Sequence, residues 1–453
     1  MKIIKITSSI IVLLCFTTQA QSLTLTDTLI NTYQNSTDLA AKREQLKAID
    51  EKIFEANSGF LPQVIFRSAY QNNKNKVNAP YGESNSDKWV KSRSKSDTFS
   101  IQQNLFASGG TLLAIEKAKY IINQGRADLE ITEAQVFMDA ISAHFEVVFS
   151  KKVLEASKKS EASIKKTLQV TKEKFEAGIG TRTNVAMAQQ SYANSVRGLI
   201  EAEGKYSTAL SAFARITGKD GISVSEYEEA HPPAATLEQA LDTAYLKNGN
   251  FIAAKNQFYA ADTEIKEVVA QMMPSLDLSL ESSRQTGRNL GSTLNDKITR
   301  NNTLAFQLTV PIYKSGREYS AIRKARSSAS ASKISLNGIA DKIKEAVSKS
   351  WYSYMTAKAS VAATEAAVTA SNIAVDGAQQ EYDEGVMAIT DLLDVQLKKL
   401  QSEISLFDAQ RNLVVASYSV KSLMGELSAI ELKLPMKYYD VEKNYNKIKF
   451  KLM

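Results

Sequence analysis

Two segments in the second half of the chain alternate between large apolar residues and residues that are polar or small. Leu276, Leu278 and Leu280 are separated by single polar residues, and the segment 304–310 repeats this pattern. A period of two places apolar side chains on one face of a strand and polar side chains on the other. Rougher versions occur at 64–70 and 99–105. The sequence therefore predicts four amphipathic strands, and we expect the polar stretches 71–95 and 285–300 between them to be loops.

The rest of the chain favours helices. The seven prolines leave the tracts 81–231 and 312–434 free of the residue that interrupts helices most strongly. The span from Gly109 to Gly178 would extend roughly 105 Å as one helix, at 1.5 Å per residue. Apolar residues in the segment 393–407 recur at alternating spacings of four and three, which fits either a coiled-coil seam or a helix of an ordinary bundle.

These elements occur in two similar halves. The tripeptide Glu176-Ala177-Gly178 and its surroundings reappear around Gly385, 207 positions later, and Ser108-Gly109 reappears as Ser315-Gly316. A fixed-period echo indicates two copies of one structural unit. Each copy should contain a helix, two strands, a long helix, a tip turn and a further helix. The helices are predicted at 24–60, 109–178 and 183–217 in the first copy and at 236–272, 316–385 and 390–424 in the second.

The N-terminus indicates export. Lys2 and Lys5 precede the apolar run 10–16, and small residues up to Ala20 suit cleavage before Gln21. Removal of this segment would also remove Cys15, the only cysteine, which excludes disulfides. The predicted organisation is a signal peptide at 1–20, a first repeat at 21–217, a linker at 218–235, a second repeat at 236–424 and a C-terminal tail at 425–453.

Charge and histidine content argue against nucleic-acid binding and against catalysis. The formal net charge is +7, and the lysine-rich stretch 433–451 is expected to be a solvated end of an exported protein. The two histidines, His144 and His231, have no triad or metal-ligand spacing around them. We therefore expect no enzymatic activity, no cofactor and no metal site.

The predicted strands cannot form a closed structure within one chain. Four strands are too few for a barrel, and lipid does not tolerate open sheet edges. Several chains must contribute. Trp89, near one strand end, suits a membrane interface, although a loop aromatic without such a role fits equally well.

The sequence resembles the TolC-type outer-membrane factor family over nearly all of its length after residue 20. The motifs that carry the resemblance are the duplicated layout, the two tips, Phe60-Leu61-Pro62-Gln63 before the strands, and the segments 104–110 and 310–316 after them. The resemblance implies a mainly α fold with a small β part. In such a homotrimer, three chains share one twelve-stranded β-barrel in the outer-membrane lipid and an α-helical barrel that extends into the periplasm.

The resemblance also implies a function. The chain would be the exit duct of a tripartite efflux pump or a type I secretion system, working with a periplasmic adaptor and an inner-membrane pump of the RND or ABC type. The alternative is a structural coiled-coil surface protein or adhesin without channel activity. An adhesin has no need of four amphipathic strands between its helical hairpins.

Two aspartates match the position of the family's gate. Asp391 and Asp394 lie three residues apart, so they share one helical face, and three chains would bring six carboxylates into one constriction. Such a ring would collect cations. The alternative is helix capping, with Thr390 as the N-cap and acidic residues in the first turn complementing the helix dipole.

The tips match the family less closely. Asn184 stands where the family often has an acidic residue, and Met387 stands where an arginine can help to lock the closed state. The candidates for a gate latch, meaning the contacts that would hold the tips closed, are Tyr382, Asn184 and Arg182. The residues expected to dock onto the adaptor are Gly178, Ile179, Gly180, Gly385, Val386 and Met387.

Overall fold

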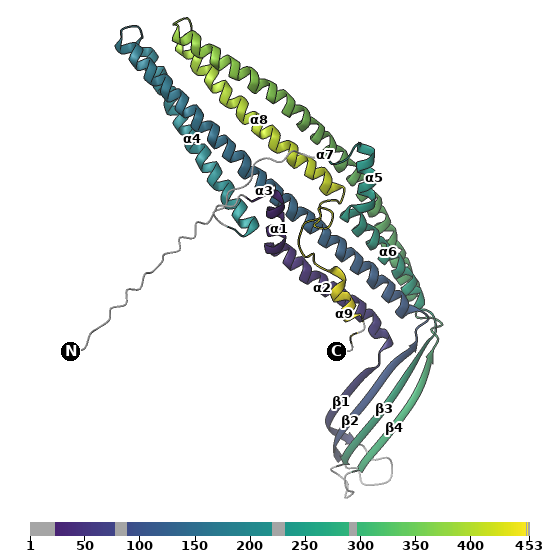
Figure 1. Ribbon diagram of the computed structural model, residues 1–453. Coiled ribbons are helices and arrows are strands. Elements are labelled where there is room, and N and C mark those ends of the chain that lie inside the picture. The colour runs from purple at the N-terminus through teal and green to yellow at the C-terminus, as the bar shows by residue number, and fades with distance from the viewer. Residues whose placement is uncertain (1–22, 78–87, 220–231, 290–296, 450, 452–453) are drawn as a thin grey trace, which may run out of the picture.

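The computed structural model is an elongated molecule with helices at one end and a sheet at the other (Figure 1). It describes residues 23–77, 88–219, 232–289, 297–449 and 451. The predicted signal peptide, most of the predicted linker and His231 lie outside the described residues.

The two halves of the chain contain the same order of elements. The first comprises α1 (Leu25–Asn35), α2 (Thr37–Asn57), a short 3₁₀ turn at Ser58–Phe60, β1 (Gln63–Val77), β2 (Lys88–Phe106), α3 (Gly110–Glu176) and α4 (Arg182–Thr217). The second comprises α5 (Leu237–Lys247), α6 (Gly249–Ala270), β3 (Ser275–Asn289), β4 (Lys297–Thr309), α7 (Arg317–Asp383) and α8 (Ile389–Leu423), and α9 (Val441–Ile448) follows. Both long helices have 67 residues, or roughly 100 Å at 1.5 Å per residue.

The shorter helices before the strands are each interrupted once, which corrects the prediction of single helices at 24–60 and 236–272. The first breaks at Ser36, whose hydroxyl accepts a hydrogen bond from the Leu39 amide. The second breaks at Asn248, whose side chain accepts from the amides of Asn250 and Phe251. Short polar side chains offer the backbone this alternative to the helical ladder, so they end one helix and begin the next.

The long helix α3 lies at the centre of the helical part. Toward its C-terminal end it packs between α4 and α8, and toward its N-terminal end between α2 and α6, while α7 packs along α6 and α8 (Figure 1). Several large apolar side chains of α7 remain exposed, among them Ile334, Tyr352 and Ile373. Within one chain α7 therefore forms an uncovered edge of the helical layer.

No described helix combines the length and the apolarity needed to cross a membrane.

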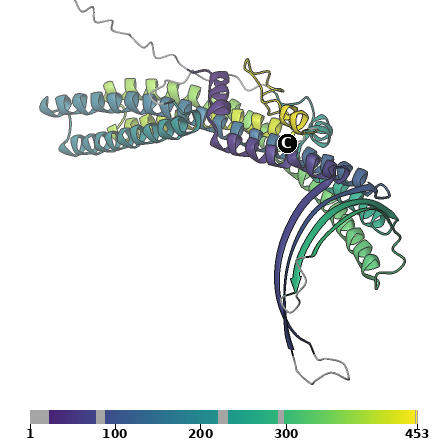
Figure 2. The same cartoon turned by 90° about the horizontal axis from the view of Figure 1, so that it is seen from below.

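The strands form one antiparallel sheet in the order β1-β2-β3-β4, and the sheet is strongly curved (Figure 2). They extend further than predicted, because β1 pairs with β2 as far as Val77 and Lys88, and β3 pairs with β4 as far as Gly287 and Lys297. The prediction of loops at 71–95 and 285–300 is therefore wrong for most of these residues. The loop prediction is based on the polar side chains of these stretches. A β-ladder is formed by hydrogen bonds between backbone groups, which pair beside polar and apolar side chains alike.

The sheet register collects the apolar residues on one face. Val64 pairs with Ile101, Ile101 with Leu280, and Leu280 with Leu304. The neighbouring rows add Phe66, Phe99, Leu278, Phe306 and Leu308. The side chains of this face are largely exposed within the chain, as Leu304 at 62% and Phe66 at 66% illustrate. An apolar surface of this extent marks a contact with another protein or with lipid.

The C-terminal segment after α8 is packed rather than solvated, which corrects the expectation for the tail. Leu427, Leu434 and Ile448 are buried at 1%, 4% and 7% exposure. The Ala429 amide donates to the Glu133 carboxylate at 2.6 Å, and the Asn444 side chain donates to Asp50 at 2.9 Å. The lysines of this segment suggested solvation, but apolar residues between them bind it to α2 and α3.

His144 is a structural residue of the helical core. It is 2% exposed, and its Nδ1 lies 2.9 Å from the Thr28 hydroxyl. The Thr28 hydroxyl donates its proton to the Thr24 carbonyl, so the geometry assigns the Nδ1 proton to the ring. Burial lowers the pKa of His144 to about 4, because the charged imidazolium would lose its hydration.

This shift predicts acid sensitivity. With a folded pKa of about 4 and an ordinary value of 6.5, the stabilising contribution of neutral His144 is complete above 6.5 and is lost as the pH falls toward 4. Each chain should lose about 2 kcal/mol between roughly pH 7 and pH 5 from this residue alone. Thermal unfolding of wild type and His144→Gln at both pH values isolates the effect, because other groups titrate equally in both. The assignment is wrong if the two proteins show the same pH dependence.

Candidate gate and docking tips

The two helical hairpins end in similar turns at the pole opposite the sheet (Figure 1). Gly178 and Gly385 adopt left-handed backbone conformations with φ of 79° and 81°. The amides of Ile179 and Val386 donate back to the carbonyls of Lys174 and Glu381, both at 2.9 Å. This is a Schellman arrangement, in which a glycine after the last helical residue allows the reversal. The repeated Gly in the tip motif therefore has a defined backbone role.

The tip turns expose small apolar surfaces. Ile179 and Val386 are each 77% exposed, and a Cβ atom added at Gly178 or Gly385 would meet no atom within 4 Å. The two remaining residues of the predicted docking set lie closer to the chain. Gly180 approaches the Phe175 backbone, and Met387 packs against the apolar cluster below the tips.

That apolar cluster, the tip core, joins all four helices of the two hairpins. Its buried members are Ile164 and Leu168 of α3, Ala188 of α4, Ala378 and Tyr382 of α7, and Ile389, Leu392 and Leu393 of α8. The tips are consequently held together by packing as well as by polar contacts.

Thr390 is not the N-cap of α8, so the capping interpretation of that residue is wrong. The N-cap is Ala388, which provides no side-chain hydrogen bond, and Thr390 is the second residue of the helix. In the first repeat the same position is Thr181, whose hydroxyl accepts from the Asn184 amide at 3.1 Å. The repeat has lost its cap at the second tip, while Asp391 still lies in the first turn, where it complements the helix dipole.

Asp391 and Asp394 share the exposed face of α8, on either side of the buried pair Leu392 and Leu393. The Asp394 carboxylate lies 2.7 Å from the Lys398 ammonium, one helical turn further on. Its hydrogen bond raises the pKa of Lys398. Among the described residues, Asp391 forms no ion pair. The two carboxylates are therefore unequal, because Asp394 carries its own counter-ion.

Tyr382 is tied to α3. It is 6% exposed, and its hydroxyl lies 2.9 Å from the Thr171 hydroxyl. The Lys174 ammonium donates to the Tyr382 carbonyl at 2.7 Å and lies 4.0 Å from the centre of its ring. A cation placed there also complements the negative C-terminal end of α7. Within the described part of the chain, the side chains of Arg182 and Asn184 form no hydrogen bond with Tyr382.

Sequence reasoning missed Thr171 and Lys174. The signal was present, since Thr167 and Thr171 are spaced by four on the same side of α3 as Ile164 and Leu168, and polar residues on an apolar face require partners. Further polar contacts connect α8 to α3 on the side of the tips that faces the sheet. Gln396, 6% exposed, donates to Thr167 at 3.2 Å.

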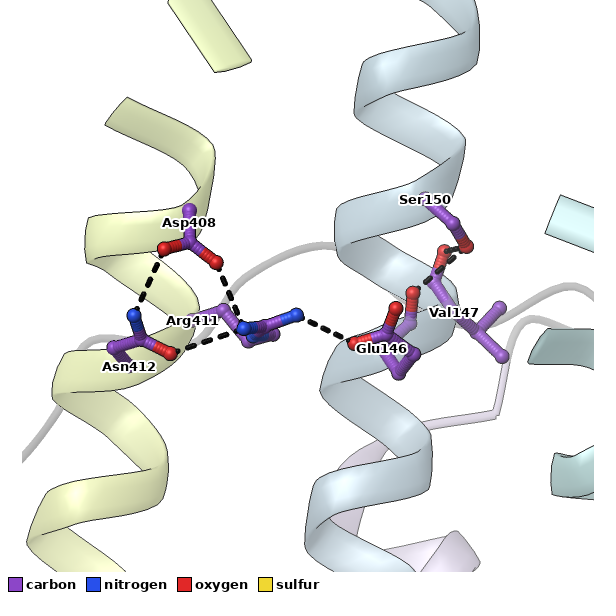
Figure 3. A network of polar contacts seen from close by, with 6 residues as sticks. All are labelled: Glu146, Val147, Ser150, Asp408, Arg411 and Asn412. Carbon is purple, nitrogen blue, oxygen red and sulfur yellow. Dashed lines mark hydrogen bonds and ion pairs between the residues drawn. The ribbon is translucent and has the colours of Figure 1, made fainter. Parts of the chain in front are cut away.

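A charged network lies still further from the tips (Figure 3). Arg411 of α8 reaches across to Glu146 of α3 at 2.7 Å and also pairs with Asp408 at 2.7 Å. The Asn412 side chain donates to Asp408 at 2.9 Å. The hairpin α7–α8 is thus joined to α3 by polar contacts at three levels, which are Tyr382, Gln396 and Arg411.

The tip geometry predicts which glycines tolerate a side chain. Gly385→Ala should cost about 1 kcal/mol of stability, because a left-handed backbone strains any residue with a Cβ atom. Gly425→Ala is the matched comparison, since Gly425 has a similar φ of 76° but its Cβ would overlap the Lys247 carbonyl. Thermal unfolding should show a small loss for the first and a large loss for the second. Equal losses would contradict an open tip.

Comparison with known proteins places these features among outer-membrane proteins. The sequence model of the family "Outer membrane efflux protein" matches residues 29–219 and 240–426. The outer membrane efflux protein BepC of Brucella suis is 25% identical over 95% of this chain and 92% of its own length. The outer membrane protein TolC of Escherichia coli is 21% identical over 91% of this chain and 85% of its own. The crystal structure of the Campylobacter jejuni CmeC outer membrane channel superposes with a TM-score of 0.75 at 14% identity, covering 94% of this chain and 89% of that one.

Proposed function

Because the chain belongs to the outer membrane efflux protein family, we propose that it is the exit duct through which an inner-membrane pump and its periplasmic adaptor expel their cargo. The protein is an outer-membrane channel-tunnel whose helices extend into the periplasm. Ducts of this kind are trimeric and operate with an adaptor and a pump. The pump, of the RND or ABC type, and its cargo, either small compounds or a polypeptide, are the finer part of the proposal.

One observation carries this proposal. The four-stranded sheet has one apolar face, and its edge strands β1 and β4 have no further partner within the described chain. Backbone groups at such edges cannot remain unpaired in lipid, so β4 of one chain would pair with β1 of the next. The uncovered edge at α7 would meet α2 and α4 of the neighbouring chain in the same assembly. An adhesin built from helical hairpins requires neither feature.

The proposed gate is the ring formed by Asp391 and Asp394 from three chains. Like charges in a narrow aqueous constriction attract cations and oppose anions. Since Asp394 is partly neutralised by Lys398, Asp391 would supply the larger share of the field. The contacts of Tyr382 with Thr171 and Lys174 would hold the neighbouring α7 end in the closed position, and Arg182 and Asn184 remain candidates for contacts between chains.

The tip turns are the proposed adaptor surface. Gly178, Ile179, Gly385 and Val386 are exposed there, with Gly180 and Met387 beside them. A bulky residue at Gly385 would meet no atom of the chain and would obstruct a partner, at the modest cost of backbone strain given above. Gly385→Leu should therefore still assemble in the outer membrane but fail to export. Failure to assemble would instead assign these glycines to turn formation alone.

Conductance of the purified protein in a planar bilayer tests the gate and the channel function together. A trivalent cation added on the periplasmic side should block wild type, and Asp391→Asn should weaken this block more than Asp394→Asn. Lys398→Gln should strengthen the block, because it frees the Asp394 charge. Asparagine has the shape of aspartate, and loss of the Asp391 charge from the first turn of α8 should cost at most about 1 kcal/mol, so unequal block reports charge in the pore.

The same recordings can also contradict the proposed gate and the proposed duct. Identical block in wild type and in the double variant Asp391→Asn with Asp394→Asn would remove both residues from the pore. A protein that inserts but never conducts would overturn the duct itself and favour a structural role.

A further inference from the structure

A second charged feature lies on the sheet, far from the gate. Besides Lys76, six cationic residues with exposed side chains lie on the same face of β1 to β4, beyond the apolar rows. They are Lys74, Lys91, Arg93, Lys95, Arg284 and Arg300, which we name the basic belt.

The belt shares a face with the lipid-compatible residues. Arg284 lies four residues after Leu280 in β3, and Arg300 lies four residues before Leu304 in β4, so the even spacing keeps each on the apolar side of its strand. Lys95, Arg93 and Lys91 continue the apolar series Ile101 and Phe99 in β2 in the same way. The belt begins one same-face row beyond Phe66 and Phe99, a step of roughly 7 Å along the strands.

The opposite face has no such excess of positive charge. Among the described side chains, its charged residues are Arg67, Asp277 and Glu281. On the belt side the only described acidic side chain is Asp97, which pairs with Lys95 at 3.1 Å. The positive charge is therefore directed outward, toward whatever surrounds the sheet, and not into the channel.

Like charges stand directly opposite each other within the belt. The register pairs Lys74 with Lys91, and Arg284 with Arg300. Direct cross-strand neighbours have Cβ atoms about 5 Å apart, and like charges in these positions destabilise a sheet. Arg284 also stands opposite the Asp97 carboxylate of β2, which in turn contacts Ser68 and Lys95. Among the described residues, Arg93 and Arg300 have no ion-pair partner. The single carboxylate of Asp97 does not balance the whole belt, and an external anion would relieve the remaining repulsion.

We propose that the basic belt binds the phosphate groups of a phosphorylated glycolipid in the outer leaflet of the outer membrane. The belt lies at the rim of the apolar band, in the half of the sheet away from the helices, where lipid headgroups of that leaflet would begin. Guanidinium groups match phosphate oxygens in a bidentate manner, and a phosphate between Arg284 and Arg300 would relieve their repulsion. This inference depends on the proposed function only through insertion of the sheet into the outer membrane.

Binding of bisphosphorylated lipid A to the purified protein tests the proposal. Fluorescent lipid A is titrated in mixed micelles against wild type, against the triple variant Arg93→Gln, Arg284→Gln and Arg300→Gln, and against Arg67→Gln. Each lost surface cation weakens binding about fivefold, so the triple variant should bind roughly 100-fold more weakly. Arg67→Gln removes one positive charge from the channel face and should bind like wild type, whereas each single substitution in the belt should weaken binding about fivefold.

Three results would overturn the proposal. The triple variant could bind as tightly as wild type, wild type could bind dephosphorylated lipid A equally well, or excess inorganic phosphate could displace the lipid, which would indicate a site for free anions. The lipid comparison needs only wild type, so it stands even if the triple variant does not fold. In phosphatidylcholine bilayers the triple variant should conduct as well as wild type. If neither protein conducts, the proposed channel function fails, and this result is distinct from a failure of lipid A binding.

Discussion

The backbone of the four-stranded sheet imposes the constraint on which the rest of the molecule depends. An amphipathic sheet with exposed Phe66, Leu304 and Phe306 needs a lipid environment, yet its edge strands β1 and β4 leave backbone groups unpaired. Both requirements are met only when copies of the chain complete one another's edges. Each pair of strands continues into a pair of helices. The helices that adjoin the strands, α2, α3, α6 and α7, therefore lie side by side in the same order as β1 to β4.

At the opposite pole, apolar packing and polar contacts together hold the helices of the two hairpins. The tip core buries apolar residues from four helices, whereas Tyr382, Gln396 and Arg411 link the hairpin α7–α8 to α3 by directional contacts. Directional bonds can be exchanged at modest net cost, about 1 kcal/mol each, while the apolar contacts between α7 and α8 persist. The hairpin α7–α8 is therefore held to α3 by both kinds of contact.

The sequence predicted elements with a strong period and missed features that depend on single polar side chains. The repeated tip glycines, the alternating strands and the proline-free tracts located both 67-residue helices, the turns and the sheet. The breaks at Ser36 and Asn248, the lost cap at Ala388 and the contact of Tyr382 with Thr171 arise from local hydrogen bonds, which carry no periodic signal. The packed C-terminal segment was obscured because its lysines mask an apolar face. The roles of Asp391 and Asp394 depend on neighbouring chains and stay predictions.

The central claim is tested most directly by measuring the mass of the protein assembly that forms the channel. Purified protein should elute from detergent as one species whose protein mass, measured by multi-angle light scattering, is three times the 49.8 kDa chain less its predicted signal peptide. The same fraction should form channels in a planar bilayer, since a single sheet with open edges cannot remain in lipid. A monodisperse monomer that still conducts would contradict the account.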